Sequence, residues 1–272
     1  MVAEGKLIHI YRASASSLSG KSVHLSSGQT LPCDAAVFAT GWKRTQPPIF
    51  DSTLLPELGL PVPLELQSAD FEKHWSTLDN ASDAEIRALF PMLASPPADV
   101  IEYFRQHERP SSNTPFRLFR NIVPPTYAAK GDRSLIILGV LLNSSIPSYA
   151  EVSSLWGIAY LENLPFTPAT DKIISDLSAM EKNVSMINAW CQLKAPSYAD
   201  EYPEGSGEIQ NFTDVLMEDL GLRSDRKVLA AERDGKKGFL GLRAWYEEWF
   251  KPYQGLDYKG IVAEYMASIP KS

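Results

Sequence analysis

A run of prolines separates two parts of the chain that differ in sequence pattern. Five prolines fall within residues 43–70, where they repeatedly block regular secondary structure. Before this interval, short runs typical of strands occur at 7–11, 21–25 and 34–39. After Pro165, apolar residues recur at helical spacing. The sequence therefore predicts a mixed α/β fold, with a β-meander at the front and a helical C-terminal region.

The same patterns divide the chain into four predicted segments. They are a β-meander with an Ala-Thr-Gly strand at 1–50, a proline-rich connection with a helical insertion at 51–130, a core strand and a helix at 131–165, and a helical region at 166–272. The core strand is RSLIILGV, residues 133–140, a nearly continuous apolar run. We expect residues 135–138 to be the most buried strand of the protein.

Capping signals and apolar periodicity predict the helices. Ser82 with Glu85, and Ser148 with Glu151, have the spacing of a capping box at a helix start. Two apolar stripes each predict one buried helical face. Their members are Val152, Leu155, Trp156 and Ala159 in the first helix, and Ile173, Leu177, Met180, Val184, Ile187 and Cys191 in a second, long helix. Further stripes, rich in aromatic residues, are interpreted as core packing. They lie within 242–250 and 258–266.

Charge and cysteine content exclude several classes of protein. The chain has 26 basic and 33 acidic residues and a net charge of −7, which does not favour a surface that follows nucleic-acid phosphates. Cys33 and Cys191 lie far apart, with no second Cys or His at metal-ligand spacing, so we expect no metal site. No stretch approaches the roughly 20 apolar residues of a membrane span, and the N-terminus lacks a signal-peptide core. We therefore expect a cytoplasmic protein without a membrane span.

No catalytic constellation stands out from the sequence. The patterns G-x-S-x-G of serine hydrolases and H-E-x-x-H of metalloproteases are both absent. A complete G-x-G-x-x-G fingerprint after a strand, which would hold a dinucleotide pyrophosphate, is absent as well. The histidines show no repeated ligand spacing; they are His9, His24, His74 and His107. The sequence therefore assigns no acid, base or nucleophile.

Several stretches resemble flavin-containing monooxygenases and related FAD/NADPH enzymes. SGKSVHLSSGQTLPCDAAVFATGW, residues 19–42, resembles the segment in which a meander leads into an aspartate, an apolar strand and Ala-Thr-Gly. Three later stretches resemble, in the same order, the late part of fungal monooxygenase-like proteins: LFRNIVPPTY at 118–127, RSLIILGV at 133–140 and YAEVSSLWGIAYL at 149–161. KPYQGLDYKGIVAEY, residues 251–265, resembles their C-terminal ends.

The resemblance, which covers roughly residues 7–266, implies the back half of a flavoprotein fold with two dinucleotide-binding domains. It implies an oxidoreductase that uses FAD and NADPH to transfer one oxygen atom to a small-molecule substrate, while the protein positions and shields the flavin. It places Thr40 and Gly41 at the crossing from the NADPH domain to the FAD domain, and Gly139 and Asn143 beside the flavin edge. Both glycine fingerprints of the family are missing, so we do not expect this chain alone to hold FAD.

Two kinds of protein fit these features. The first is an FAD-dependent monooxygenase-like oxidoreductase of secondary metabolism, present as a truncated product or as one half of a split enzyme. Its partner would be an N-terminal flavoprotein half or a second copy of the chain. The alternative is a binding or scaffold protein without flavin, or a non-redox enzyme, that reuses the substrate cleft. A G-x-G-x-x-G encoded in frame upstream of Met1 would favour truncation.

Overall fold

The computed structural model describes residues 9, 11–35, 49–107, 111–141, 146–194, 209–236 and 238–269. The chain divides into two compact units, Met1–Pro48 and Ile49–Ser272.

The first unit contains a small antiparallel sheet. Strands β1 (Ala15–Ser19), β2 (Ser22–Leu25) and β3 (Thr30–Pro32) follow one another in the order β1-β2-β3. Tight turns join them, with Gly20 at φ +57° and Gly28 at φ +86°, backbone angles that glycine adopts without strain. A small antiparallel meander is therefore present, but only β2 coincides with a predicted strand, the run at 21–25, whereas β1 and β3 lie outside the predicted runs.

Some parts of the first unit carry predictions that lie outside the described residues. These parts include most of the runs at 7–11 and 34–39, together with Thr40 and Gly41. The predicted strand that leads into Ala-Thr-Gly stays a prediction.

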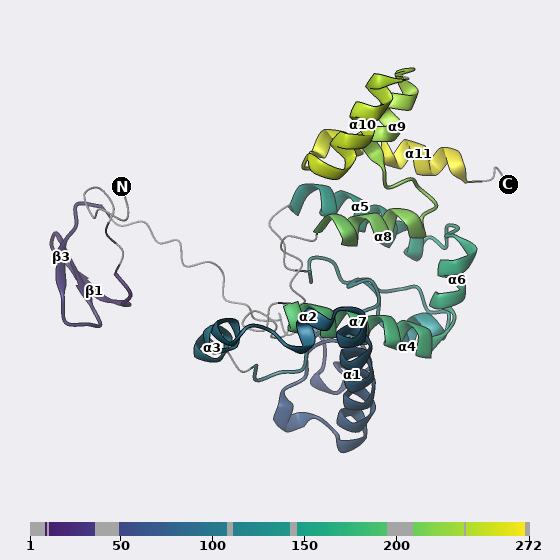
Figure 1. Cartoon of the computed structure of the whole chain (residues 1–272). Coiled ribbons are helices and arrows are strands. Elements are labelled where there is room, and N and C mark those ends of the chain that lie inside the picture. Colours follow the sequence, from purple (N-terminus) through teal and green to yellow (C-terminus); the bar gives the residue numbers. More distant parts are fainter. Residues whose placement is uncertain are drawn as a thin grey trace. The chain divides into compact units, whose positions relative to one another are not determined.

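The described residues of the second unit are mostly helical (Figure 1). Its α-helices are α1 (Ala69–Leu89), α2 (Pro91–Ala94), α3 (Ala98–His107), α4 (Pro125–Ala129), α5 (Ile146–Leu161), α6 (Pro168–Ile174), α7 (Leu177–Lys194), α8 (Ile209–Asp219), α9 (Arg226–Arg233), α10 (Phe239–Phe250) and α11 (Ile261–Ser268). Three short 3₁₀ helices accompany them: η1 (Ser52–Leu54), η2 (Leu64–Leu66) and η3 (Gly255–Tyr258). Helix α1 packs along α7, α5 along α8, and α9 along α10.

A large apolar core joins the helices of this unit. The predicted face of α5 is confirmed, because Val152, Trp156 and Ala159 are fully buried and Leu155 is nearly so. Trp156 stacks on Tyr160, with ring centroids 5.8 Å apart. Aromatic–apolar packing of this kind supplies most of the driving force for folding.

Three predicted helix boundaries are wrong. The capping box at Ser148 does not begin α5, because the helix already includes Ile146 and Ser148 lies inside it. Helix α1 begins thirteen residues before Ser82, after Ser68, whose hydroxyl accepts a hydrogen bond from Phe71 N at 3.2 Å. Ser82 is instead buried inside the helix, because the polar segment before it continues the helix rather than ending it. The long stripe that starts at Ile173 spans two helices, since the chain turns between α6 and α7 and Asp176 accepts from Ala179 N at the new helix start.

The predicted core strand at 133–140 is also wrong. None of these residues belongs to a strand, and Leu138 is 43% exposed. Among the described residues, the backbone of this segment bonds to a neighbouring segment through Ile137 N, which donates to Ile122 O at 2.8 Å. Its side chains pack in two directions, Leu135 and Ile137 on a small cluster around Leu118 and Ile136 on the larger core. An apolar run can thus be explained by two flanking clusters without a neighbouring strand.

The aromatic stripe of α10 is not core packing. Its members, which we call the α10 aromatic face, are exposed: Phe239, Leu242, Trp245, Tyr246, Trp249 and Phe250. Trp249 is 71% exposed, whereas Ala244 on the opposite side of the helix is buried against its surroundings. The stripe at 258–266 is mixed, with Tyr258, Ile261 and Tyr265 buried. Spacing alone identifies an apolar face but does not say what covers it.

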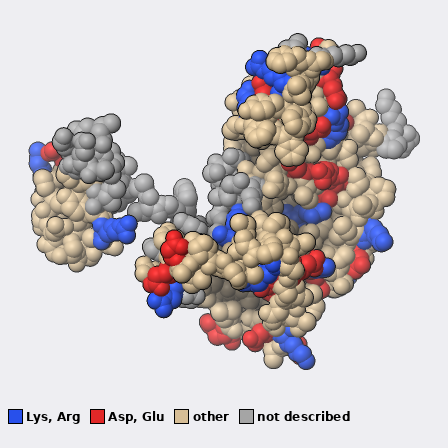
Figure 2. Space-filling model, viewed as in Figure 1, with Lys and Arg blue, Asp and Glu red and all other residues tan. Residues whose placement is uncertain are grey.

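The charged residues are interspersed on the visible surface (Figure 2). Lys and Arg do not form one continuous area on the face shown, in agreement with the net charge. Among the described residues, no helix is both long and apolar enough to cross a membrane, and no cluster of His, Cys, Asp and Glu is suited to a metal ion.

Candidate functional site

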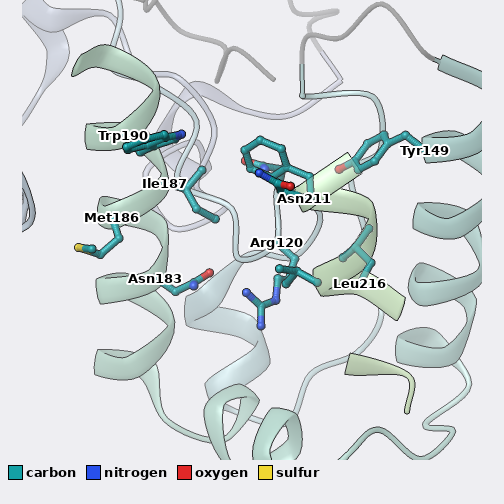
Figure 3. A pocket seen from close by; sticks show the side chains of 11 residues that line it. Arg120, Tyr149, Asn183, Met186, Ile187, Trp190, Asn211 and Leu216 are labelled. Atoms are coloured by element: carbon teal, nitrogen blue, oxygen red, sulfur yellow. The ribbon is translucent and has the colours of Figure 1, made fainter. Parts of the chain in front are cut away.

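A cavity of about 290 Å³ lies between α7, α8, the start of α5 and the turn at 119–123 (Figure 3). The described residues that line it are Arg120, Asn121, Tyr149, Asn183, Met186, Ile187, Trp190, Asn211, Phe212, Val215 and Leu216. Most of this lining is apolar. A concave, largely apolar cavity with a few polar groups is the usual form of a small-molecule site.

One helical face of α7 forms one wall of the cavity. Asn183, Met186, Ile187 and Trp190 follow the spacing i, i+3, i+4, i+7, so they share a face. Another side of α7 is fixed from behind, because Asn188 Nδ2 donates to Phe116 O at 2.9 Å. This hydrogen bond helps to fix the position of α7 and of the side chains with which it lines the cavity.

A left-handed turn forms another part of the wall. Arg120 has φ +55° and Asn121 φ +59°, and two successive non-glycine residues in this region cost about 1–2 kcal/mol each. The turn is closed by hydrogen bonds in both directions between Phe119 and Val123, at 2.8 and 3.0 Å. Strain of this kind persists where the surrounding structure holds it, and it is often found at functional sites.

The surrounding structure holds the turn through the carboxylate of Asp219, at the end of α8. Arg120 donates to it through Nε at 2.8 Å and Nη2 at 2.9 Å. Trp156 Nε1 donates to the same carboxylate at 3.0 Å, and Thr170 Oγ1 at 2.8 Å. Asp219 is buried, the Arg120 side chain is 12% exposed, and each carboxylate oxygen accepts two hydrogen bonds. The charge of Arg120 is therefore compensated by protein groups.

A second ion pair, between buried Arg117 and half-buried Asp79, fixes α7 against α1. Arg117 donates to the two carboxylate oxygens of Asp79 at 2.8 and 2.6 Å, and Ser185 Oγ donates to Asp79 at 2.7 Å. The Arg117 guanidinium also lies 4.3 Å from the centre of the Trp75 ring. These contacts set the position of the wall that carries Asn183.

Two polar side chains point into the cavity in Figure 3, Asn183 from α7 and Tyr149 from α5. Asn183 Oδ1 is buried and has no hydrogen-bond partner among the described residues. Burial raises the pKa of Tyr149 above its ordinary value of 10.0, so its hydroxyl stays protonated at neutral pH. The cavity therefore offers uncharged hydrogen-bonding groups.

The described lining contains no histidine, cysteine, lysine or carboxylate. With the Tyr149 phenol held neutral, the part of the cavity that the structure describes lacks a group suited to proton transfer near neutral pH. The arrangement is suited to binding a molecule and orienting it.

The predicted cofactor residues are not part of this described lining. Thr40, Gly41 and Asn143 lie outside the described residues. Gly139 has φ +80°, and a Cβ placed on it would meet no atom within 4 Å. Its backbone is therefore open to a close approach by another group.

The residues described near Gly139 do not provide a binding site for the pyrophosphate of FAD. They provide an open backbone position, but no glycine-rich turn before a helix that could bind a pyrophosphate. In the sequence as a whole, no complete G-x-G-x-x-G occurs either. Thr40, Gly41, Gly139 and Asn143 as cofactor contacts stay a prediction.

Sequence reasoning missed the cavity. Asn183, Met186, Ile187 and Trp190 have helical spacing in the sequence, but this face contains polar residues. The more apolar face of the same helix, with Met180, Val184 and Cys191, is the one that predicts core packing. The role of Asp219 had no local signal, because its partners lie 49 to 99 positions away.

Comparison with known proteins gives three informative relatives. The chain is 27% identical over 259 residues to "FAD-dependent monooxygenase DEP4" of Fusarium langsethiae, covering 95% of this chain and 40% of that protein. It is 29% identical over 259 residues to the protein of the same name from Alternaria brassicicola, covering 95% and 39%. It is 29% identical over 289 residues to "FAD-dependent monooxygenase avaB" of Aspergillus versicolor, covering 96% and 37%.

Other comparisons gave no match. No family model matches the chain, and no solved structure is significantly similar to it. The chain spans about 40% of the length of the curated relatives it matches. Over nearly all of its own length, it is thus similar to a part of proteins named FAD-dependent monooxygenases, which supports the resemblance found in the sequence.

Proposed function

We propose that this chain acts as the substrate-binding part of an FAD-dependent monooxygenase of secondary metabolism, and that the cavity between α7 and α8 holds the organic substrate. The observation that carries the proposal is the alignment of 95% of the chain with proteins named FAD-dependent monooxygenases. The apolar cavity with few polar groups supports it from the structure.

The division of labour follows from what the chain contains. FAD, when bound, supplies the electron transfer and the activation of dioxygen by which one oxygen atom reaches the substrate. More than half of the length of each relative lies outside the match. A polypeptide equivalent to that unmatched part would hold the pyrophosphate of FAD. Gly139 would let its backbone approach the cofactor, with Thr40, Gly41 and Asn143 as further predicted contacts.

The lining residues would bind, orient and shield the substrate. Met186, Ile187 and Phe212 would exclude water from its apolar part, and Asn183 would fix its orientation by a hydrogen bond. NADPH as the reductant, and a cytoplasmic location, belong to the proposal through the family resemblance.

The test has two arms. In the first, the purified 272-residue chain is examined by visible absorption, and flavin released on denaturation is assayed. We expect a colourless protein that does not oxidise NADPH. In the second, the chain is mixed with the separately produced part of the Alternaria brassicicola relative that lies outside the match. We expect FAD to be retained and NADPH-dependent oxygen uptake to appear.

A matched pair of glycine variants tests the flavin contact. Gly139→Ala and Gly131→Ala both place a side chain at positive φ with nothing within 4 Å, so their backbone strain is comparable. Only Gly139→Ala should weaken flavin retention in the mixture. Stoichiometric FAD in the chain alone would contradict the division of labour. Absence of flavin in both arms would favour a binding protein without flavin.

A further inference from the structure

The buried amide oxygen of Asn183 is the strongest unexplained feature of the cavity. Its Oδ1 atom is shielded from solvent, and the described residues give it no hydrogen-bond donor. A buried acceptor without a donor costs about 1–3 kcal/mol, so proteins rarely keep one without a reason. Figure 3 shows the side chain directed from α7 toward the interior of the cavity. A bound molecule that donates a hydrogen bond would satisfy this atom.

The charges around the cavity favour a neutral ligand. Arg120 is the only charged residue in the described lining, and it forms a two-bond ion pair with Asp219. The Asp219 carboxylate needs no further hydrogen-bond donor, because Trp156 and Thr170 also donate to it. An anionic ligand would have to compete with this carboxylate, and a cationic ligand would lie near an arginine without a free carboxylate.

The rest of the lining favours a flat apolar body. Trp190 from α7 and Phe212 from α8 contribute aromatic rings to the lining, and Met186 adds a flexible side chain that adapts to irregular shapes. A volume of about 290 Å³ is at the lower end of small-molecule sites. This size suits a ligand of one or two rings.

We propose that the cavity binds a neutral, largely apolar ring compound that donates one hydrogen bond to Asn183 Oδ1. A phenol or another hydroxylated ring has this chemistry. The inference rests on the proposed function in taking such a compound as the substrate class, but the binding itself requires neither FAD nor NADPH. The two proposals can therefore fail separately.

The experiment compares two probes, in the second of which the hydroxyl hydrogen, the hydrogen-bond donor of the first, is replaced by a methyl group. Binding of 2-naphthol and of 2-methoxynaphthalene to the full chain is measured by equilibrium dialysis without flavin. Both probes have the same two rings, but only the naphthol can donate to Asn183. We expect the naphthol to bind about tenfold more tightly, the ratio given by one hydrogen bond to a buried acceptor.

Three variants locate the effect. Asn183→Leu should remove the preference for the naphthol, and Asn183→Ala serves the same purpose if leucine does not fit. Asn211→Leu is the matched control, because Asn211 also lines the cavity but is exposed, and it should keep the preference. Val215→Trp should fill the cavity and weaken both probes.

One readout does not depend on any probe. Asn183→Leu should unfold at a higher urea concentration than the parent chain, because the unsatisfied acceptor has been removed, and Asn211→Leu should not. The proposal is overturned if the folded parent binds neither probe or binds both equally. It is also overturned if the preference survives in Asn183→Leu and Asn183→Ala, or if Val215→Trp leaves binding unchanged, which would place the probes elsewhere, for example on the α10 aromatic face.

Discussion

Arg120 and Asp219 are 99 positions apart in the chain and form a buried ion pair with two hydrogen bonds, at 2.8 and 2.9 Å. The pair joins the left-handed turn at 119–123 to the end of α8. It therefore connects two walls of the cavity, and it brings a cation and an anion out of water together.

Loss of the Asp219 charge should destabilise the protein strongly. Asp219→Ala leaves Arg120 buried without its partner, a change that typically costs about 3–5 kcal/mol. Urea unfolding followed by circular dichroism measures it. The control is Asp234→Ala, which removes an exposed ion pair with Lys236 and should cost less than about 1 kcal/mol. Similar losses in the two variants would mean that the Asp219 network contributes no more than a surface contact.

A methyl group at Gly59 should be poorly tolerated. A Cβ there would lie 2.4 Å from the carbonyl oxygen of Arg117, and φ is +66°. Gly131 also has positive φ, at +76°, but has open space around it. We expect Gly131→Ala to cost about 1–2 kcal/mol from backbone strain alone, and Gly59→Ala clearly more, because the collision adds to the same strain. Equal unfolding midpoints would show that the loop at Gly59 moves freely away from Arg117.

Asp214 should make stability depend on pH in the acid range. Burial raises its pKa from 3.8 to about 6, which outweighs the opposing hydrogen bond from Gln210. The folded protein then binds more protons than the unfolded chain between these values, so this contribution is full below pH 3.8 and is lost as pH rises through 6. Asp214→Asn should therefore unfold at a higher urea concentration than the parent chain at pH 7.5. Its free energy of unfolding should be larger by about 1 kcal/mol after allowance for solvent screening.

The same experiment at pH 4 should bring Asp214→Asn and the parent chain together. Asp51 gives the opposite case, since hydrogen bonds from Thr53 lower its pKa below 3.8. Asp51→Asn should therefore lose stability at pH 7.5 rather than gain it. If Asp214→Asn has a smaller free energy of unfolding than the parent chain at pH 7.5, this result would contradict the raised pKa of Asp214.

The α10 aromatic face should contribute little to the stability of the isolated chain. Trp249 is largely exposed, so Trp249→Gln should change the free energy of unfolding by less than about 0.5 kcal/mol. Trp156→Gln, in the core, should cost about 3–5 kcal/mol. Exposed apolar patches promote association, so Trp249→Gln should also lower the mean mass found by light scattering at high protein concentration. An unchanged mass together with a large loss of stability would show that the face is covered.

Local patterns predicted the parts of the fold that depend on neighbouring residues. The strand at 21–25 and the buried face of α5 both follow from the spacing of apolar residues. The run at 133–140 was misjudged because burial by two clusters and burial in a sheet give the same apolar sequence. The prediction of core packing for the α10 aromatic face is wrong because the spacing of apolar residues does not show whether another element covers them.

The cavity depended on information that no local window contains. Asn183 became notable only when the structure showed its oxygen to be buried without a donor. The left-handed turn is carried by Arg120 and Asn121, residues that do not signal positive φ as glycine does. Their conformation is set by contacts with Asp219, which comes from a distant helix.

The long sequence separation of the Arg120–Asp219 pair has a consequence for the order of folding. Local helices such as α5 can form early. Closing a loop of 99 residues, in contrast, costs chain entropy before the contacts at its ends can stabilise the structure. We therefore expect the left-handed turn and the cavity to be completed late, when α8 docks. The indole nitrogen of Trp156, one of six tryptophans, donates to the same carboxylate. The part of the fluorescence change that a Trp156→Phe variant lacks should then reach its native value after the helical circular dichroism signal in stopped-flow refolding.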